Sequence, residues 1–196
     1  MRKTDIILAG VGGQGILTIA AIIAKSALEA GMHIKQAEVH GMSQRGGAVQ
    51  SNLRISDKPV ASDLIPQGKA DLILAVEPME ALRYLPYLSK NGWIVSNAAH
   101  FINIPNYPEP EAIEAELKKI NNLVLIDADR IAADLGTSRA SNIVMLGAAS
   151  PFIDVDNTLI LQSISDYFKN KGEKIVNLNL DAFALGRQKT NEVYVQ

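Results

Sequence analysis

Cysteine is absent from the 196 residues of this chain. Without thiolates the chain can form no disulfide framework, hold no iron–sulfur cluster on its own and offer no thiol nucleophile. A stretch of about 18 uninterrupted apolar residues is also missing, so the sequence predicts no membrane-spanning helix. Lys and Arg never form a run of five or more, and the formal net charge is −2. This distribution argues against nucleic acid as a partner, because binding to phosphates needs clustered basic residues.

Apolar residues, in contrast, make up 47% of the chain, which excludes an intrinsically disordered protein. The length suits one large domain with a sizeable core. The charged N-terminus is followed by only a short apolar run, residues 6–11, before glycines begin. Such a run is too short for the core of a signal peptide and is typical of a first strand. We therefore expect a soluble, cytoplasmic protein.

Strand-like and helix-like segments alternate along the chain. Short apolar or alternating runs predict strands at residues 5–11, 33–39, 48–55, 70–76, 93–96 and 123–126. Periodic segments predict helices at residues 14–30, 78–88, 109–120 and 139–149, another that begins near residue 157, and a last one at 173–187. This alternation indicates the α/β class, with three α/β/α layers around a Rossmann-like sheet.

Two further expectations concern the sheet and the domain organisation. The helix at 14–30 joins the first two strands by a short crossover, so we expect these strands to form a parallel pair. A strand, and not a helix, follows the second strand, which indicates a mixed sheet. No interdomain linker interrupts the pattern, so residues 1–188 are expected to form a single domain and residues 189–196 a C-terminal tail.

A glycine-rich loop connects the first strand to the first helix. Its G-x-G-x-x-G pattern consists of Gly10, Gly12 and Gly15. Glycines let the backbone turn sharply, and a helix N-terminus offers free N–H groups and a partial positive charge to an anion. The loop can therefore serve a dinucleotide, with Glu38 on the ribose, or contact another anion or cofactor, or simply allow close packing of helix on sheet. The dinucleotide interpretation is the weakest, because the second strand leads into a further strand.

A second polar loop, at residues 38–47, combines an acid, an imidazole, a guanidinium and three glycines. Loops at the carboxyl ends of parallel strands are where α/β proteins bind ligands. If the first two strands are parallel neighbours, the two glycine-rich loops lie at the same edge of the sheet. Arg45 could then clamp a phosphate or carboxylate. An ordinary ion pair of Arg45 in a solvated loop stays equally open.

Three stretches of this sequence resemble one family. The segments GVGGQGILT (residues 10–18) and AEVHGMSQRGGAVQSNLRIS (37–56) look like the gamma-type domain of the 2-oxoacid:ferredoxin oxidoreductases. The segment RASNIVMLGA (139–148) is similar to a helix of the same family. The resemblance covers nearly the whole chain, and within the family the GMSQRGG run is most similar to the small, or beta, subunit of the indolepyruvate (aryl-pyruvate) type.

The resemblance implies a subunit of an enzyme rather than an enzyme active alone. Members of this family decarboxylate a 2-oxoacid on thiamine diphosphate, pass two electrons through iron–sulfur clusters to ferredoxin and release an acyl-CoA. In the indolepyruvate type, a large partner subunit is expected to hold thiamine diphosphate, Mg and the clusters. This chain would carry no cofactor of its own and would work in a hetero-oligomer, with coenzyme A (CoA) as co-substrate.

The resemblance also implies where the site residues lie. The two loops and the later helix are expected to face the active site or the path of CoA, through Gly10, Gly12, Gly13, Gln14, Gly15, Glu38, Gly41, Ser43, Gln44, Arg45, Gly46, Gly47 and Asn142. Alternatives that stay open are a gamma subunit for pyruvate, 2-oxoglutarate or a branched-chain 2-oxoacid, a stand-alone dinucleotide-binding oxidoreductase, and a non-catalytic assembly module.

Two polar residues permit both a functional and a structural interpretation. His40 is a candidate for hydrogen bonding or proton handling near the substrate, although a structural or interface role fits its position better. Asn142 either reaches a ligand or satisfies a buried backbone group.

The remaining candidates are interpreted structurally. Trp93 is expected in the core. Asp127 and Asp129 are expected to supply a helix cap and no metal site. His33 and His100 show no metal-ligand spacing.

Overall fold

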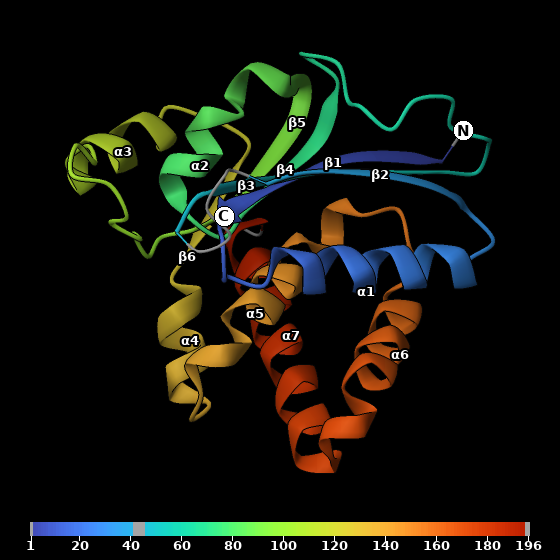
Figure 1. Cartoon of the computed structure of the whole chain (residues 1–196). Coiled ribbons are helices and arrows are strands. Elements are labelled where there is room, and N and C mark those ends of the chain that lie inside the picture. Colours follow the sequence, from blue (N-terminus) through green and yellow to red (C-terminus); the bar gives the residue numbers. More distant parts are fainter. Residues whose placement is uncertain (1, 41–45, 195–196) are drawn as a thin grey trace.

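The computed structural model describes residues 2–40 and 46–194. A mixed sheet forms its centre, and the strand order is β2-β3-β1-β4-β5-β6 (Figure 1). The strands are β1 (Lys3–Val11), β2 (His33–His40), β3 (Ala48–Ser56), β4 (Ala70–Ala75), β5 (Leu88–Asn97) and β6 (Leu123–Ile126). β1, β4, β5 and β6 run parallel, whereas β3 is antiparallel to both of its neighbours.

Helices cover both faces of this sheet, so the expected three-layer α/β/α architecture with a mixed sheet is confirmed (Figure 1). One face carries α1 (Ile16–Glu29), α4 (Ala128–Asp134), α5 (Ser141–Ala149), α6 (Asn157–Phe168) and α7 (Glu173–Tyr194). The other face carries α2 (Pro78–Arg83) and α3 (Pro110–Leu117). Among the described residues, none of these helices is long and apolar enough to cross a membrane.

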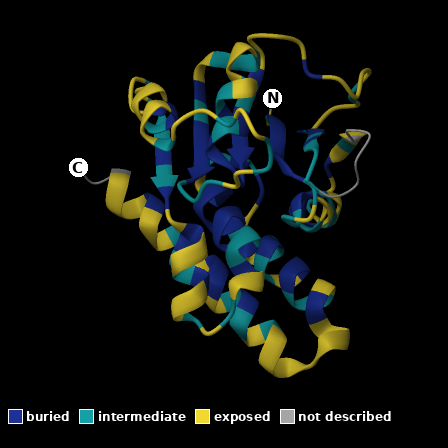
Figure 2. Cartoon of the chain, turned by 60° about the vertical axis from the view of Figure 1, so that its left-hand side comes forward, coloured by how far each residue is buried: buried dark blue, intermediate teal, exposed yellow. Residues whose placement is uncertain are grey.

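Alternation along the central strands produces two separate cores. In β1, Ile6 and Leu8 belong to the larger cluster with α1 and α5, whereas Ile7 and Ala9 belong to the smaller cluster with α2 and α3. All four side chains are almost fully buried. Successive strand residues point to opposite faces, so a strand covered on both sides becomes a continuous apolar run. Figure 2 shows the buried sheet between helices whose outer surfaces are exposed.

The expected parallel pairing of the first two strands is wrong. β3 lies between β1 and β2 and pairs antiparallel with each, so β2 is the edge strand. The physical reason is burial: Leu53 and Ile55 of β3 are fully buried, while Val39 of β2 is 55% exposed. The more apolar strand therefore takes the central position.

The C-terminal segment also differs from the expectation. We expected a tail at 189–196, but α7 continues to Tyr194. Thr190 is fully buried, and its hydroxyl donates to the carbonyl of Ala148 in α5 over 2.8 Å. The helix is therefore held at this end by a polar contact that the apolar periodicity does not reveal.

Two smaller differences concern the region after β4. The helix expected at 78–88 ends at Arg83 and is followed by a 3-10 turn, Leu85–Tyr87. The short strand expected at 93–96 is β5, which begins already at Leu88.

Close packing of α5 against α7 fixes the position of α5, whose first turn forms part of the site. A Cβ at Gly147 would lie 2.0 Å from the carbonyl oxygen of Phe183, and a Cβ at Gly186 would lie 1.9 Å from that of Val144. Only glycine permits such backbone contact between two helices.

Candidate functional site

The first glycine loop is built by its own side chains and by α5. The Gln14 side-chain oxygen accepts a hydrogen bond from the Val11 N–H over 2.7 Å, which closes the turn after β1. Gly15 adopts φ +79°, and a Cβ there would lie 2.5 Å from Nδ2 of Asn142. The same Nδ2 donates to the Gly15 carbonyl over 3.2 Å. Asn142 therefore adds a hydrogen bond to a carbonyl that already accepts from the N–H groups of Thr18 and Ile19, and it joins the N-terminus of α1 to α5.

The two glycine loops lie at the same edge of the sheet, as expected. The Gly12 N–H donates to the Gly47 carbonyl over 2.9 Å, and the Gly46 N–H donates to the Gly12 carbonyl over 3.5 Å. Because β1 and β2 point in the same direction, β3 between them does not separate their carboxyl ends. The expected roles of Gly41, Ser43, Gln44 and Arg45 lie outside the described residues, as does that of the His40 side chain.

A cleft of about 660 Å³ opens beside the first loop. Its floor and walls come from the start of α1, the start of α5, the carboxyl ends of the central strands and the end of α6. The start of α1 contributes Gly13, Gln14, Gly15 and Thr18. The start of α5 and the turn before it contribute Ser138, Arg139, Ser141 and Asn142. Such a crevice at the carboxyl ends of strands is where open α/β sheets bind ligands.

The electrostatics of this cleft favour an anion. α1 has neither a side-chain cap nor an acidic residue in its first turn. α5 continues a 3-10 turn, Ser138–Ala140, which Thr137 caps by accepting from the Arg139 N–H over 3.2 Å. The start of α1 therefore presents unpaired N–H groups and the positive end of the helix dipole, and the dipole of α5 points its positive end at the same cleft. Arg139 and Lys171 add two positive charges to the lining, against one negative charge from Asp129. The cleft is therefore suited to a phosphate-bearing ligand.

Sequence reasoning missed several residues of this cleft. Asn97, at the end of β5, is 3% exposed; its Oδ1 accepts from the Ala128 N–H over 3.0 Å, and its Nδ2 donates to the Val76 carbonyl over 3.4 Å. It thereby joins β4, β5 and α4 at the floor. The signal available in the sequence was a polar residue directly after the strand predicted at 93–96. Phe101, Tyr167 and Lys171 belong to segments that are distant in the sequence, and no motif indicated them.

The position of Glu38 argues against the dinucleotide interpretation. Glu38 is exposed on the edge strand, where its carboxylate accepts from the Gln36 side-chain amide over 2.7 Å. In register it lies opposite Ser51 of β3, which in turn lies opposite Leu8 of β1. Two strand spacings, roughly 10 Å, thus separate Glu38 from β1. A ribose-binding acid belongs on the strand next to the glycine loop.

The other polar candidates have structural roles. Asp127 caps α4 by accepting from the Arg130 N–H over 2.9 Å. Asp129 is exposed at the cleft, and no group of three possible metal ligands occurs within residues 2–40 and 46–194. Trp93 is half-buried and stacks on Phe152, with ring centroids 4.7 Å apart, against the larger core.

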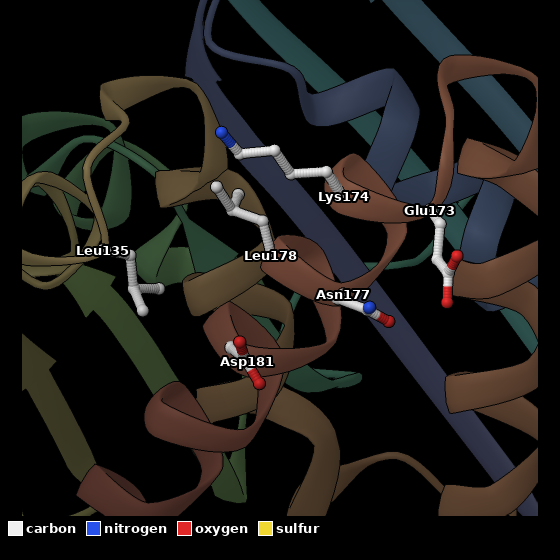
Figure 3. A pocket seen from close by; sticks show the side chains of 6 residues that line it. All are labelled: Leu135, Glu173, Lys174, Asn177, Leu178 and Asp181. Carbon is white, nitrogen blue, oxygen red and sulfur yellow. The ribbon is translucent and has the colours of Figure 1, made fainter.

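A second hollow, between the end of α4 and the start of α7, is a weaker candidate. It has a volume of about 470 Å³ and is lined by Leu135, Glu173, Lys174, Asn177, Leu178 and Asp181. Its charged groups point in different directions and do not converge on one point (Figure 3). Because groups of opposite charge line this hollow without pointing at one place, it favours neither an anion nor a cation.

Comparisons with known proteins agree with the resemblance that the motifs indicated. The chain is 38% identical over 193 residues to indolepyruvate oxidoreductase subunit IorB of Archaeoglobus fulgidus, with 94% of each chain covered. It is 35% identical to the IorB subunit of Pyrococcus horikoshii, with 98% of each covered. A solved structure of 2-oxoglutarate:ferredoxin oxidoreductase from Magnetococcus marinus matches the fold with a TM-score of 0.78 at 20% identity, over 98% of this chain and 32% of that one. Residues 5–189 match the family described as pyruvate ferredoxin/flavodoxin oxidoreductase, and the chain belongs to this family.

Proposed function

We propose that this chain is the small subunit of an indolepyruvate ferredoxin oxidoreductase, which converts an aryl pyruvate to an aryl-acetyl-CoA and passes the electrons to ferredoxin. The observation that carries the proposal is the 38% identity with an IorB subunit along 94% of both chains. Similarity that extends from end to end supports the same type of subunit and not merely the same fold. Residues 1–188 then form a single gamma-type domain, which α7 extends to Tyr194.

The division of work between the subunits follows from the residues present. None of the 196 residues is a cysteine, so thiolate-bound clusters must reside in the partner. In this proposal the large subunit holds thiamine diphosphate with Mg and the iron–sulfur clusters, and the diphosphate cofactor supplies the carbanion chemistry of decarboxylation there. The chain is therefore inactive alone and works in a hetero-oligomer. The cytoplasmic location stays a prediction.

We assign to this chain the binding and orientation of CoA. The cleft presents the uncapped N-terminus of α1 together with Arg139 and Lys171, a combination that suits the phosphates of a nucleotide. The aromatic rings of Phe101 and Tyr167 also line it and offer apolar surface. With its phosphates held here, CoA could extend its flexible thiol arm to the large subunit. Because the thiol would then approach from one direction, the entropy cost of acyl transfer to it would be lower.

The substrate type is tested with the complex of this chain and the large subunit from the same source. Rates of CoA-dependent viologen reduction are measured with indolepyruvate, phenylpyruvate, pyruvate, 2-oxoglutarate and 2-oxoisovalerate. We expect kcat/KM to be at least about tenfold higher for the two aryl substrates, because a pocket built for a ring gains about 1.4 kcal/mol or more from its burial. A preference for any of the other three would overturn the aryl assignment while leaving the family unchanged.

A further inference from the structure

A second group of buried polar side chains lies behind the rim of the cleft, apart from the glycine loops. Its centre is Glu77, which follows β4 and is fully buried. One carboxylate oxygen, Oε2, accepts from the Glu80 N–H over 2.9 Å and caps α2. The other, Oε1, accepts from the Tyr107 hydroxyl and, over 3.4 Å, from the Phe101 N–H. The carboxylate thus joins α2 to a loop that begins 21 residues later, at residue 98.

This loop, residues 98–109, contains no regular helix or strand. Hydrophobic burial does not anchor its middle, because Phe101 is 44% and Ile102 69% exposed. The Tyr107 ring packs against the smaller core, and polar contacts hold the rest: the two bonds to Glu77, and a 3.0 Å contact between Nδ1 of His100 and the Tyr107 hydroxyl. A loop of this composition adopts a single position only as long as such contacts persist.

The loop reaches the site at two points. Phe101 lines the cleft. Nδ2 of Asn103 donates to the Gly46 carbonyl over 2.7 Å, and the Gly46 N–H in turn donates to Gly12 of the first glycine loop. A continuous series of contacts therefore runs from Glu77 through the loop to both glycine loops.

The chemistry of the Glu77 site is costly for a purely structural anchor. A fully buried carboxylate loses its hydration, and only opposite charge or hydrogen bonds compensate. The hydrogen-bond donors to Glu77 are neutral, namely two backbone N–H groups and a phenol, and the nearby Arg83 pairs with Glu80 over 2.9 Å. Burial and the neighbouring Glu77 both raise the pKa of the Tyr107 hydroxyl, so this group stays protonated and keeps donating. An apolar contact would hold the loop at a lower desolvation cost. It would not, however, orient the Glu80 N–H, the Phe101 N–H and the Tyr107 hydroxyl toward one side chain.

We propose that Glu77 is a positioning residue: its buried carboxylate fixes the loop 98–109, and so places Phe101 at the mouth of the cleft and Gly46 against the first glycine loop. Its consequence for catalysis rests on the proposed function, because it acts on the cleft assigned to CoA. Loss of the Glu77 carboxylate displaces the loop 98–109 and with it Phe101 at the edge of the cleft. Binding of CoA then weakens, while turnover at saturating CoA, which is set in the partner subunit, changes little.

Two variants of graded severity test this inference. Glu77→Gln leaves a single acceptor oxygen in place of two, and Tyr107→Phe removes one hydroxyl but keeps the ring. Tyr87→Phe is the matched control, because it removes the same hydroxyl from a ring that packs against the same smaller core while Glu77 keeps its hydrogen bonds. Each variant is purified as the complex with the large subunit and also as the full chain.

The first readout is amide hydrogen exchange of the full chain, which does not require enzyme activity. We expect exchange in residues 98–109 to become at least about fivefold faster in Tyr107→Phe and faster still in Glu77→Gln, with β6 and the Tyr87→Phe control unchanged. Unchanged exchange in both variants would overturn the anchor. Hydrogen exchange tests the anchor even if the wild-type complex is inactive. An inactive complex would contradict the proposed function but not the anchoring role of Glu77.

The second readout is the kinetics of the complex. We expect the KM for CoA to rise about fivefold in Tyr107→Phe, the loss of one net hydrogen bond, with kcat within about twofold and the KM for the 2-oxoacid unchanged. Should exchange accelerate while all kinetic constants stay at the wild-type level, Glu77 would be a structural anchor only and the positioning role would be wrong. Glu77→Gln that does not fold leaves Tyr107→Phe to decide.

Discussion

At the scale of single residues, the two ends of α1 provide an internal comparison. Gly15 at its start and Gly31 after its end both adopt left-handed backbone, with φ +79° and +70°, but only at Gly15 would a Cβ collide with a neighbour, Asn142. Both substitutions by alanine incur the left-handed strain of about 1 kcal/mol. We expect Gly15→Ala to lower the free energy of unfolding in urea by about 1–2 kcal/mol more than Gly31→Ala. Equal losses would mean that Asn142 does not hold this loop.

Arg139 is the residue through which the charge of the cleft is tested. It is exposed in the 3-10 turn, Ser138–Ala140, that precedes α5, so water screens its attraction for a phosphate. We expect Arg139→Ala in the complex to raise the KM for CoA about five- to tenfold, which this screening keeps below the full effect of one charge-assisted hydrogen bond, and to reduce its salt dependence. Arg130→Ala is the control, because Arg130 lines a different hollow, beside α7. An effect of the same size from both substitutions would contradict a phosphate site at Arg139.

At the scale of elements, the contact between α5 and α7 predicts the sign of a change in the free energy of unfolding. Replacing glycine by alanine inside a helix ordinarily stabilises it by up to about 1 kcal/mol. At Gly186 the new methyl group would meet the Val144 carbonyl at 1.9 Å, and we expect Gly186→Ala to lower the free energy of unfolding by about 1–3 kcal/mol instead. Urea denaturation of the full chain measures it. A stabilised variant would show that the two backbones do not touch.

The elements themselves were predictable wherever local signals were strong. The strand at 123–126 is found at its predicted bounds, and the glycine loop follows β1 where the motif indicated. The end of α7 was missed, because residues 188–192 are all polar and Thr190 is buried through a hydrogen bond to α5. The break after Arg83 was missed because the apolar residues around Pro86 still follow a helical period. Local periodicity records burial of apolar groups and not polar contacts between distant segments.

At the scale of the whole molecule, strand order was the feature that local sequence could not supply. Whether β2 or β3 lies beside β1 depends on a competition for the central position, which Leu53 and Ile55 decide in favour of β3. The candidate site could be predicted only in part, because it combines local motifs with residues that tertiary packing brings in. Gly12, Gly15, Gly46, Gly47 and Asn142 do meet, as the motifs indicated. Phe101, Tyr167 and Lys171 join them only through tertiary packing.

The central claim is that this chain is an obligatory subunit of a larger enzyme, and one titration tests it most directly. The purified large subunit is held at fixed concentration, this chain is added in increasing amounts, and CoA-dependent reduction of viologen by indolepyruvate is followed. The account predicts a negligible rate for either chain alone and a rate that rises with added chain until it saturates at a fixed ratio of the two subunits. A full rate from the large subunit alone, or no rate at any ratio although the large subunit carries its cofactors, would contradict the account.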